Sequence, residues 1–237
     1  FGFITSIYIY QFCYMISMKY LAFFYLTFIM IIVLTSISSS SFINRKNPDN
    51  YLSNVIINIG YSLALLVAMN KFYLYKGESF KFNILKVIGL LVVFDTLFYW
   101  SHITMHRVPW LKKRLHETHH RNMALVPLDF LYEGMLSVLV NSSLYFVLPC
   151  LALTFVETVV YLVIIILHLA YTHSETSIDF PIPLFINARY HSLHHTIGRG
   201  NYGLLFPFWD DYMNTKIKDP MKRKTKRKKA KYFIDII

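Results

Sequence analysis

The ten histidines of this chain all lie between His102 and His195, in the patterns H-x-x-x-H, H-x-x-H-H, H-x-x-x-x-H and H-x-x-H-H. Neutral imidazole is a ligand for iron, zinc and copper, and residues three or four apart on a helix share one face. Because one tetrahedral ion uses about four protein ligands, so many converging histidines indicate two metal ions. Solvated or pH-sensing histidines are the alternative, which leaves the spacing unexplained.

Every histidine is therefore a candidate metal ligand. His168 and His173 are five residues apart, a poorer fit to one helical face, unless the helix unwinds near Ser174. Ordinary histidines at a membrane interface are the alternative for these two. The full candidate set is His102, His106, His116, His119, His120, His168, His173, His191, His194 and His195.

Two carboxylates are placed to orient these imidazoles. Asp95 precedes His102 by seven residues, about two helical turns, so both lie on one face of an apolar segment where an unpaired carboxylate is costly. We expect it to accept a hydrogen bond from a histidine N–H. Asp210 could do the same or could brace the basic region. The alternatives are a capping or helix-pairing role for Asp95 and a packed aromatic turn around Asp210.

The elements that must carry these residues are predicted to be membrane helices. Of the 237 residues, 55% are hydrophobic and only 16% are charged, which indicates an integral membrane protein. Because about 20 apolar residues cross the hydrocarbon core, we predict an all-α bundle of four to five spans under a cytosolic helical cap. The predicted spans are residues 20–38, 53–70, 84–101, 135–153 and 155–173.

The chain is predicted to form one membrane domain, 1–237, whose parts are N-terminal spans (1–83), a catalytic region (84–215) and a basic tail (216–237). The chain begins at Phe1 rather than methionine, as a fragment does. The apolar residues 1–18 stay open between a span, an interfacial helix and a signal remnant.

Both histidine blocks face one compartment if residues 135–173 form a two-span hairpin turning near Pro149 or Thr154. The positive-inside rule places the cationic residues around the first block in the cytosol. A polar connection is expected over 71–86, and its lysines then fall in a luminal loop. Lysines that snorkel from helix ends, or a re-entrant hairpin over 53–101, are two ways to resolve this conflict.

The net charge of +11 is mainly a property of the tail, because residues 216–231 hold ten Lys or Arg against Asp219. Beside several spans, such a run favours the anionic cytoplasmic leaflet, and we predict no nucleic-acid partner. A merely solvated tail is the alternative. Cys13 and Cys150 lie in apolar segments and are predicted to be small buried side chains.

The histidine order and spacing, with D-x-x-x-Y-W before it and N-Y-G and W-D after it, resemble the fatty acid hydroxylase and sterol desaturase superfamily over roughly residues 90–215. Only nine residues separate His106 from His116, shorter than the gap in membrane acyl-CoA desaturases. The resemblance implies membrane helices under a cytosolic dimetal site that uses O2 to oxidise C–H bonds in sterols, acyl chains, alkylglycerols or waxes. It also implies that nine histidines are ligands and leaves His168 as a tenth candidate.

The resemblance also marks Asn201 and Trp209, in the N-Y-G and W-D motifs, as residues that support the ligands. The chain departs from the family at Asp211, where an arginine is frequent, and at Asn214, where a glycine is frequent. Both departures affect the region around the W-D motif and leave the histidines intact.

Acid–base groups cannot break an unactivated C–H bond, so the expected cofactors are two iron ions with O2 as co-substrate. We predict a hydroxylase or desaturase, with a sterol as first choice and a fatty acyl or alkylglycerol lipid as alternative. The chain has no G-x-G-x-x-G motif, so electrons must come from outside. By resemblance, the donors are cytochrome b5 and its NAD(P)H reductase, and the location is the endoplasmic reticulum if the cell is eukaryotic.

Two other classes of protein remain as alternatives. A transition-metal transporter needs several ionisable residues at mid-membrane depth, and here Asp95 and Glu157 are nearly the only candidates. A membrane zinc protease needs H-E-x-x-H, whereas this chain has H-E-T-H-H. Both rank below the oxygenase.

Overall fold

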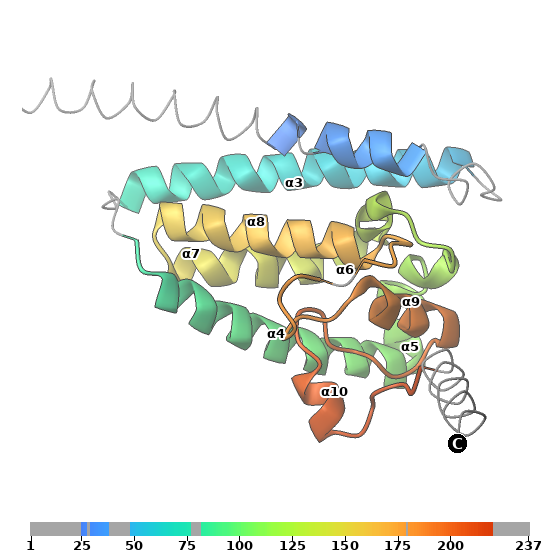
Figure 1. Ribbon diagram of the computed structural model, residues 1–237. Helices are drawn as coiled ribbons and strands as arrows, with labels where there is room; N and C mark the ends of the chain where they lie inside the picture. The colour runs from blue at the N-terminus through green and yellow to red at the C-terminus, as the bar shows by residue number, and fades with distance from the viewer. Residues whose placement is uncertain (1–24, 28, 38–47, 77–81, 179, 220–237) are drawn as a thin grey trace, which may run out of the picture.

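The computed structural model describes residues 25–27, 29–37, 48–76, 82–178 and 180–219, all of whose regular elements are helical (Figure 1). Four segments are long and apolar enough to cross a membrane. They belong to α3 (Pro48–Lys76), α4 (Ile84–Arg107), the run of α6 (Met135–Ser142), η4 (Ser143–Val147) and α7 (Leu148–Ala152), and α8 (Phe155–Thr172). The predicted all-α membrane bundle of four to five spans is confirmed.

Most of the other predictions for the N-terminal part of the chain concern residues that lie outside the described ranges. Tyr25–Ile37 is a shorter apolar helix within the predicted span 20–38. Residues 1–18, residues 38–47 and most of the basic tail lie outside the described residues. The apolar exteriors of the spans suit lipid contact, since Ile57 and Leu85 leave 59% and 73% of their surface uncovered.

Local sequence signals set the ends of the helices. The Asn83 side chain accepts a hydrogen bond from the Leu85 N–H at the start of α4, and Val108 ends the helix just before Pro109. Thr154 and Glu157 form a capping box at the start of α8. The span hairpin therefore turns at Thr154, one of the two predicted positions, while Pro149 lies in the first turn of α7.

The predicted polar connection over 71–86 is wrong in extent. Lys71 and Lys76 lie within the last turns of α3, and Lys86 lies in the first turn of α4. Long lysine side chains are compatible with a helix end because they can extend toward polar surroundings. Lys81 lies outside the described residues.

The spans pack in layers, with α8 and the α6–α7 segment between α3 and α4 (Figure 1). Phe94 of α4 and Tyr161 of α8 are fully buried against each other, with ring centroids 6.0 Å apart in an edge-on arrangement. This packing brings the C-terminal ends of α4 and α8 to one end of the bundle.

A cap of short elements covers that end (Figure 1). Its first part follows α4, and its second part follows α8. The cap elements are α5 (Pro109–Leu111), η1 (Lys112–His116), η2 (His119–Arg121), η3 (Pro127–Leu131), α9 (Ala188–Ile197) and α10 (Phe208–Tyr212).

Candidate metal centre

Nine of the ten histidines gather into two groups under the cap. Within each group, one ligand atom per residue lies within 4.8 Å of the others. The five-histidine group consists of His102, His106, His116, His120 and His194, and the four-histidine group consists of His119, His173, His191 and His195.

Each H-x-x-H-H motif contributes to both groups. In the first motif, His116 and His120 join the five-histidine group, while His119 joins the other. The last motif reverses this pattern, because its outer pair joins the four-histidine group and His194 joins the five-histidine group. Neighbouring residues on a helix are rotated by about 100°, so an i, i+4 pair shares a direction that the residue between them does not.

The imidazole nitrogens within each group lie at the separation expected of ligands around one ion. In the five-histidine group, Nε2 of His116 lies 2.9 Å from Nε2 of His102 and 2.9 Å from Nε2 of His120. In the four-histidine group, Nε2 of His191 lies 3.1 Å from those of His173 and His195. Ligands about 2.1 Å from an ion at right angles are about 3 Å apart. The donor set therefore fits a metal in each group.

Hydrogen bonds to backbone carbonyls fix the tautomer of three of these histidines. A carbonyl only accepts, so Nδ1 must carry the proton where His102 meets Tyr202 O at 2.8 Å, His194 meets Gly200 O at 2.7 Å and His173 meets Leu169 O at 2.8 Å. In the neutral ring, Nε2 is then left with a free lone pair. Three lone pairs thus face neighbouring Nε2 atoms, an arrangement that a metal ion would stabilise.

Burial keeps the cap histidines neutral. Removal from water lowers the pKa of His173, His191, His194 and His195 well below the usual value, and neighbouring histidines lower it further. Only a neutral imidazole can ligate a metal, so these rings need not release a proton at neutral pH.

The two groups are adjacent. The rings of His120 and His195, which belong to different groups, stack with centroids 4.5 Å apart. His119 and His116 are another pair across the boundary, with centroids 5.4 Å apart. The arrangement is that of a dimetal site rather than of two distant sites.

The prediction that Asp95 accepts a hydrogen bond from a histidine is wrong, because its partners are backbone N–H groups. One Asp95 carboxylate oxygen accepts from the backbone N–H groups of Leu204 and Leu205, at 3.1 and 2.7 Å. The carboxylate holds the loop after α9, and the carbonyl of Tyr202 in that loop holds His102. Asp95 therefore reaches the histidines only through the backbone.

Asp210 is a second brace of the same loop. Its two carboxylate oxygens accept from the Tyr202 and Gly203 N–H groups at 2.9 and 2.7 Å, and from the Tyr190 hydroxyl at 2.9 Å. Thr215 donates a further bond of 2.6 Å. Asp210 is fully buried, and none of its hydrogen bonds within the described residues involves a histidine, so its carboxylate braces this loop and the Thr215 side chain.

Asn201 and Trp209 likewise form their hydrogen bonds with groups other than the histidines. Asn201 adopts a φ of +53°, which asparagine tolerates, and its amide donates to Tyr190 O at 2.8 Å. The Trp209 indole N–H donates to the Thr96 hydroxyl at 3.0 Å and its ring stacks on Tyr99. The Asn201 bond therefore fastens the loop to α9, and the Trp209 contacts fasten α10 to α4.

His168 lies outside both groups. Its Nε2–H donates to Leu204 O at 3.0 Å, and its ring contacts Phe180 and Phe185. Because α8 continues to Thr172 and His173 follows as its C-cap, the five-residue spacing directs the two rings to different places. The structure thus brings together nine of the ten predicted ligands.

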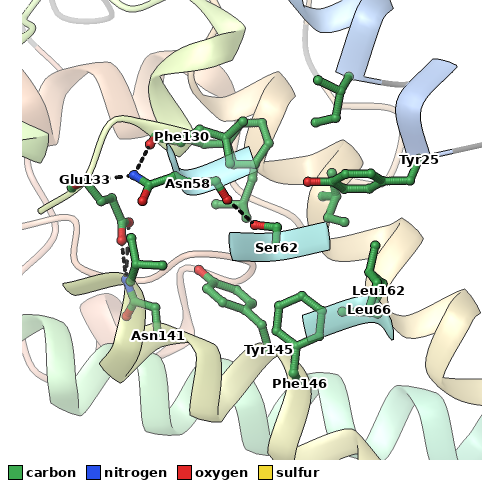
Figure 2. Close-up of a pocket in the computed structure, with 15 residues that line it drawn as sticks. Tyr25, Asn58, Ser62, Leu66, Phe130, Glu133, Asn141, Tyr145, Phe146 and Leu162 are labelled. Carbon is green, nitrogen blue, oxygen red and sulfur yellow. Dashed lines mark hydrogen bonds between the residues drawn. The ribbon is translucent and has the colours of Figure 1, made fainter. Parts of the chain in front are cut away.

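Two cavities that share part of their lining lie between the spans and beside the histidines, and they are lined by functional candidates that sequence reasoning missed. A cavity of about 90 Å³ lies between α3, α6, η4 and α8, and a smaller one of about 20 Å³ lies against five of the histidines. Glu133, Asn141 and Tyr145 line both, and Figure 2 shows these three residues at the larger cavity. The smaller cavity has room for about one water-sized group.

A sequence signal for these residues exists. Asn54, Asn58 and Ser62 follow one another at intervals of four residues, as do Glu133, Ser137 and Asn141. Polar side chains repeated at this interval in an apolar span lie on one helical face and indicate a lined cavity or a helix contact.

Comparison with known proteins identifies a family match over the region that contains both histidine groups. Residues 87–215 match the family described as fatty acid hydroxylase. Lathosterol oxidase of Rattus norvegicus is 33% identical over 138 residues, which cover 54% of this chain and 43% of that protein. Cholesterol 25-hydroxylase of Rattus norvegicus is 27% identical over 138 residues, covering 54% of this chain and 46% of that protein. No solved structure matches significantly.

A third relative is very-long-chain aldehyde decarbonylase GL1-10 of Oryza sativa subsp. japonica, 31% identical over 133 residues that cover 51% of this chain and 44% of that protein. The chain spans about half the length of the curated relatives it matches. Members of the matched family are di-iron hydroxylases and desaturases. The match covers more than half of the chain and includes both histidine groups, and on this ground the chain belongs to the fatty acid hydroxylase family.

Proposed function

We propose that the chain is a membrane-bound di-iron oxidoreductase that uses O2 to hydroxylate or desaturate a lipid, and that its substrate is a sterol. The observation that carries this proposal is the pair of adjacent histidine groups at the end of four candidate spans. In the proposal, residues 84–215 are the catalytic region, and the nine grouped histidines hold two iron ions. Bound iron supplies, with O2, the oxidising power for a C–H bond that acid–base side chains lack.

The residues of the chain position the reactants. The loop braced by Asp95 and Asp210 orients the imidazoles through its carbonyl groups. The apolar cavity between the spans receives the lipid from the bilayer, where an apolar substrate is already concentrated. The small cavity beside the histidines limits how much water can accompany it.

Sterol is the first choice because two of the relatives are a lathosterol oxidase and a cholesterol 25-hydroxylase. The alternative of a fatty acyl or alkylglycerol substrate is favoured by the aldehyde decarbonylase relative, whose name refers to very long chains. The metal-transporter alternative gains no support within the described spans. Their two carboxylates, Asp95 and Glu157, accept hydrogen bonds from backbone N–H groups.

We also propose that the metal centre faces the cytosol, in the endoplasmic reticulum if the cell is eukaryotic, and receives electrons from cytochrome b5 and its NAD(P)H reductase. The cationic side chains beside the first histidine block support this orientation by the positive-inside rule. They are Arg107, Lys112, Lys113, Arg114 and Arg121, in or next to α4, η1 and η2.

The enzyme proposal is tested with a matched pair of histidine variants. His119→Ala removes a member of the four-histidine group, whereas His168→Gln keeps an N–H that can still donate to Leu204 O. Sterols and acyl lipids are then compared in cells expressing wild type, each variant or no protein, and the metal content of each purified protein is measured. We expect His119→Ala to lose product and about one of the two metal ions, and His168→Gln to keep the product and both ions. An oxidised lipid made equally by His119→Ala would contradict the proposal.

The electron-donor proposal needs a separate experiment. Purified protein with iron, O2 and lipid is assayed with and without cytochrome b5, its reductase and NAD(P)H. We expect turnover only with the complete system. Sustained turnover without any external donor would refute this part while leaving the oxygenase proposal intact.

A further inference from the structure

A polar cluster, formed by Glu133 and Asn141 together with Asn58, lies where the lining of the apolar cavity meets that of the small cavity beside the histidine groups. Glu133 and Asn141 line both cavities, which otherwise share only Phe130, Tyr145 and Leu169. Figure 2 shows Asn58, Glu133 and Asn141 gathered at one end of the larger cavity, with Tyr25, Leu66 and Leu162 at the other. A lipid that approaches the metal groups from this cavity passes the cluster.

The backbone of Glu133 is fixed from the neighbouring helix. Its carbonyl accepts from the Asn54 amide at 2.8 Å and from the Asn58 amide at 3.1 Å, both on α3. The Asn58 amide also donates to Leu131 O at 2.7 Å. Asn54 and Asn58 of the apolar helix α3 thus fix the backbone between η3 and α6, and this backbone carries the Glu133 side chain.

Hydrogen bonding determines which way the Asn141 amide points. Its Nδ2 lies 3.2 and 2.9 Å from the two carboxylate oxygens of Glu133, and a carboxylate accepts but does not donate. Nδ2 must therefore face Glu133, as Figure 2 shows. Ser137 donates a further bond of 3.0 Å to the same carboxylate.

This orientation leaves an acceptor without a donor. Asn141 is 6% exposed, and its Oδ1 atom is buried with no hydrogen-bond partner among the described residues. A buried acceptor without a partner costs about 1 to 3 kcal/mol, so a ligand that brings a donor binds more tightly there. A neutral hydroxyl is the donor that costs least to bring from a bilayer, because a cation is expensive to desolvate.

We propose that Asn141, held by Glu133, is a specificity-determining acceptor that selects neutral lipids carrying a hydroxyl group over lipids ending in a carboxylate. The hydroxyl donates to Asn141 Oδ1, and the hydrocarbon lies in the apolar cavity. A lipid carboxylate has no proton to donate and meets the Glu133 carboxylate at close range, which is unfavourable in low dielectric. The inference rests on the proposed function only in taking this cavity as the substrate site.

Equilibrium binding tests the proposal without turnover. Full-length protein in nanodiscs is titrated with tritiated 1-hexadecanol, which is then displaced by 1-methoxyhexadecane or by hexadecanoate at pH 9. The ether keeps the chain and the oxygen but has no O–H. We expect wild type to bind the alcohol about tenfold more tightly than the ether or the carboxylate, since one buried hydrogen bond is worth about 1.4 kcal/mol.

Variants then assign the preference to the cluster. Asn141→Leu should bind alcohol and ether within twofold of each other, and Glu133→Gln should bind hexadecanoate more tightly than wild type does. Leu139→Ala changes a side chain that is 47% exposed on the same helix and should behave as wild type. The proposal is overturned if wild type binds all three lipids alike, as it would if a water satisfied Oδ1, or if Asn141→Leu keeps the preference. Because no oxidation is measured, either result leaves the oxygenase proposal standing.

Discussion

The two histidine groups differ in how they are held. In the five-histidine group, Nδ1 of His102 and of His194 donates to loop carbonyls, and buried carboxylates fasten that loop. In the four-histidine group only His173 has such a bond, while Nδ1 of His119, His191 and His195 is buried with no partner among the described residues. The five-histidine group is thus braced through the outer nitrogens of two histidines, although both ring nitrogens of His106 are also buried without a partner among the described residues, and the four-histidine group is braced through one. The four-histidine group therefore depends more on its ligand count and on the metal.

This contrast predicts that the two groups differ in how well they keep their metal ion when one histidine is removed, and this is the largest effect that we expect. His195→Ala leaves three histidines in its group, whereas His106→Ala leaves four in the other. Since about four ligands satisfy an ion, we expect His195→Ala to retain about one metal ion per chain and no activity, and His106→Ala to retain about two. Elemental analysis of both purified variants measures the metal ions per chain, and product assays measure their activity. Equal metal loss in the two would remove the contrast.

Acid should act on the cap before it acts on the spans. Burial lowers the pKa of His191, His194 and His195 in the folded protein, whereas in the unfolded chain these groups titrate near the usual 6.5. Below that pH the unfolded state binds more protons, so stability falls as pH falls, by at most about 1.4 kcal/mol per pH unit for each histidine. Between pH 7 and 8 we expect a much smaller change, because most of these histidines are then neutral in the unfolded chain as well.

The measurement is the thermal unfolding of metal-free protein from pH 8 to pH 5, followed together with metal retention by the loaded form. Both should decline together below pH 6.5, because protons compete with the metal for the same nitrogens. Greater stability of the metal-free protein at pH 5 than at pH 7 would contradict the assignment of neutral histidines.

The braces of the five-histidine group are expected to matter less than the ligands but still measurably. Asp210→Ala leaves several donors without their acceptor, and each buried donor costs about 1 to 3 kcal/mol, so we expect a loss of about 3 kcal/mol. Metal affinity should fall about 10- to 100-fold. Asp211→Ala is the matched control, since Asp211 is exposed and pairs only with Lys216 among the described residues. Similar effects of the two substitutions would disprove the bracing role.

The smallest effect concerns one bond to the same carboxylate. Burial, reinforced by Asp210, raises the pKa of the Tyr190 phenol, which therefore stays protonated and donates to Asp210. Tyr190→Phe should cost about 1 kcal/mol in chemical denaturation and leave the metal count unchanged. A loss as large as that of Asp210→Ala would mean that Tyr190 has a role beyond this bond.

Much of the site could be predicted because histidine spacing is a local property. His102 and His106 lie on α4 at the predicted spacing, and every grouped histidine belongs to the predicted set. How each H-x-x-H-H motif divides between the groups was not predicted. In the first motif that division depends on how the π and 3-10 turns at η1 and η2 rotate successive side chains, and in the second it follows the regular rotation of about 100° per residue along α9.

The partners of Asp95 and the place of His168 could not be predicted for a different reason. Both depend on where the loop of residues 200–205 lies, and that position arises from contacts between residues about a hundred positions apart, such as Asp95 with Leu205. The cluster around Glu133 did have a signal in its four-residue spacing. The histidine pattern did not point to it, because Asn141 and its neighbours belong to no metal-ligand motif.

The most direct test of the dimetal centre is a crystal structure of the iron-loaded protein with anomalous difference density recorded at the iron edge. The account predicts two iron peaks, one surrounded by Nε2 atoms of the five-histidine group and one by those of the four-histidine group. A single peak, or a second peak bound by residues outside these nine histidines, would contradict it.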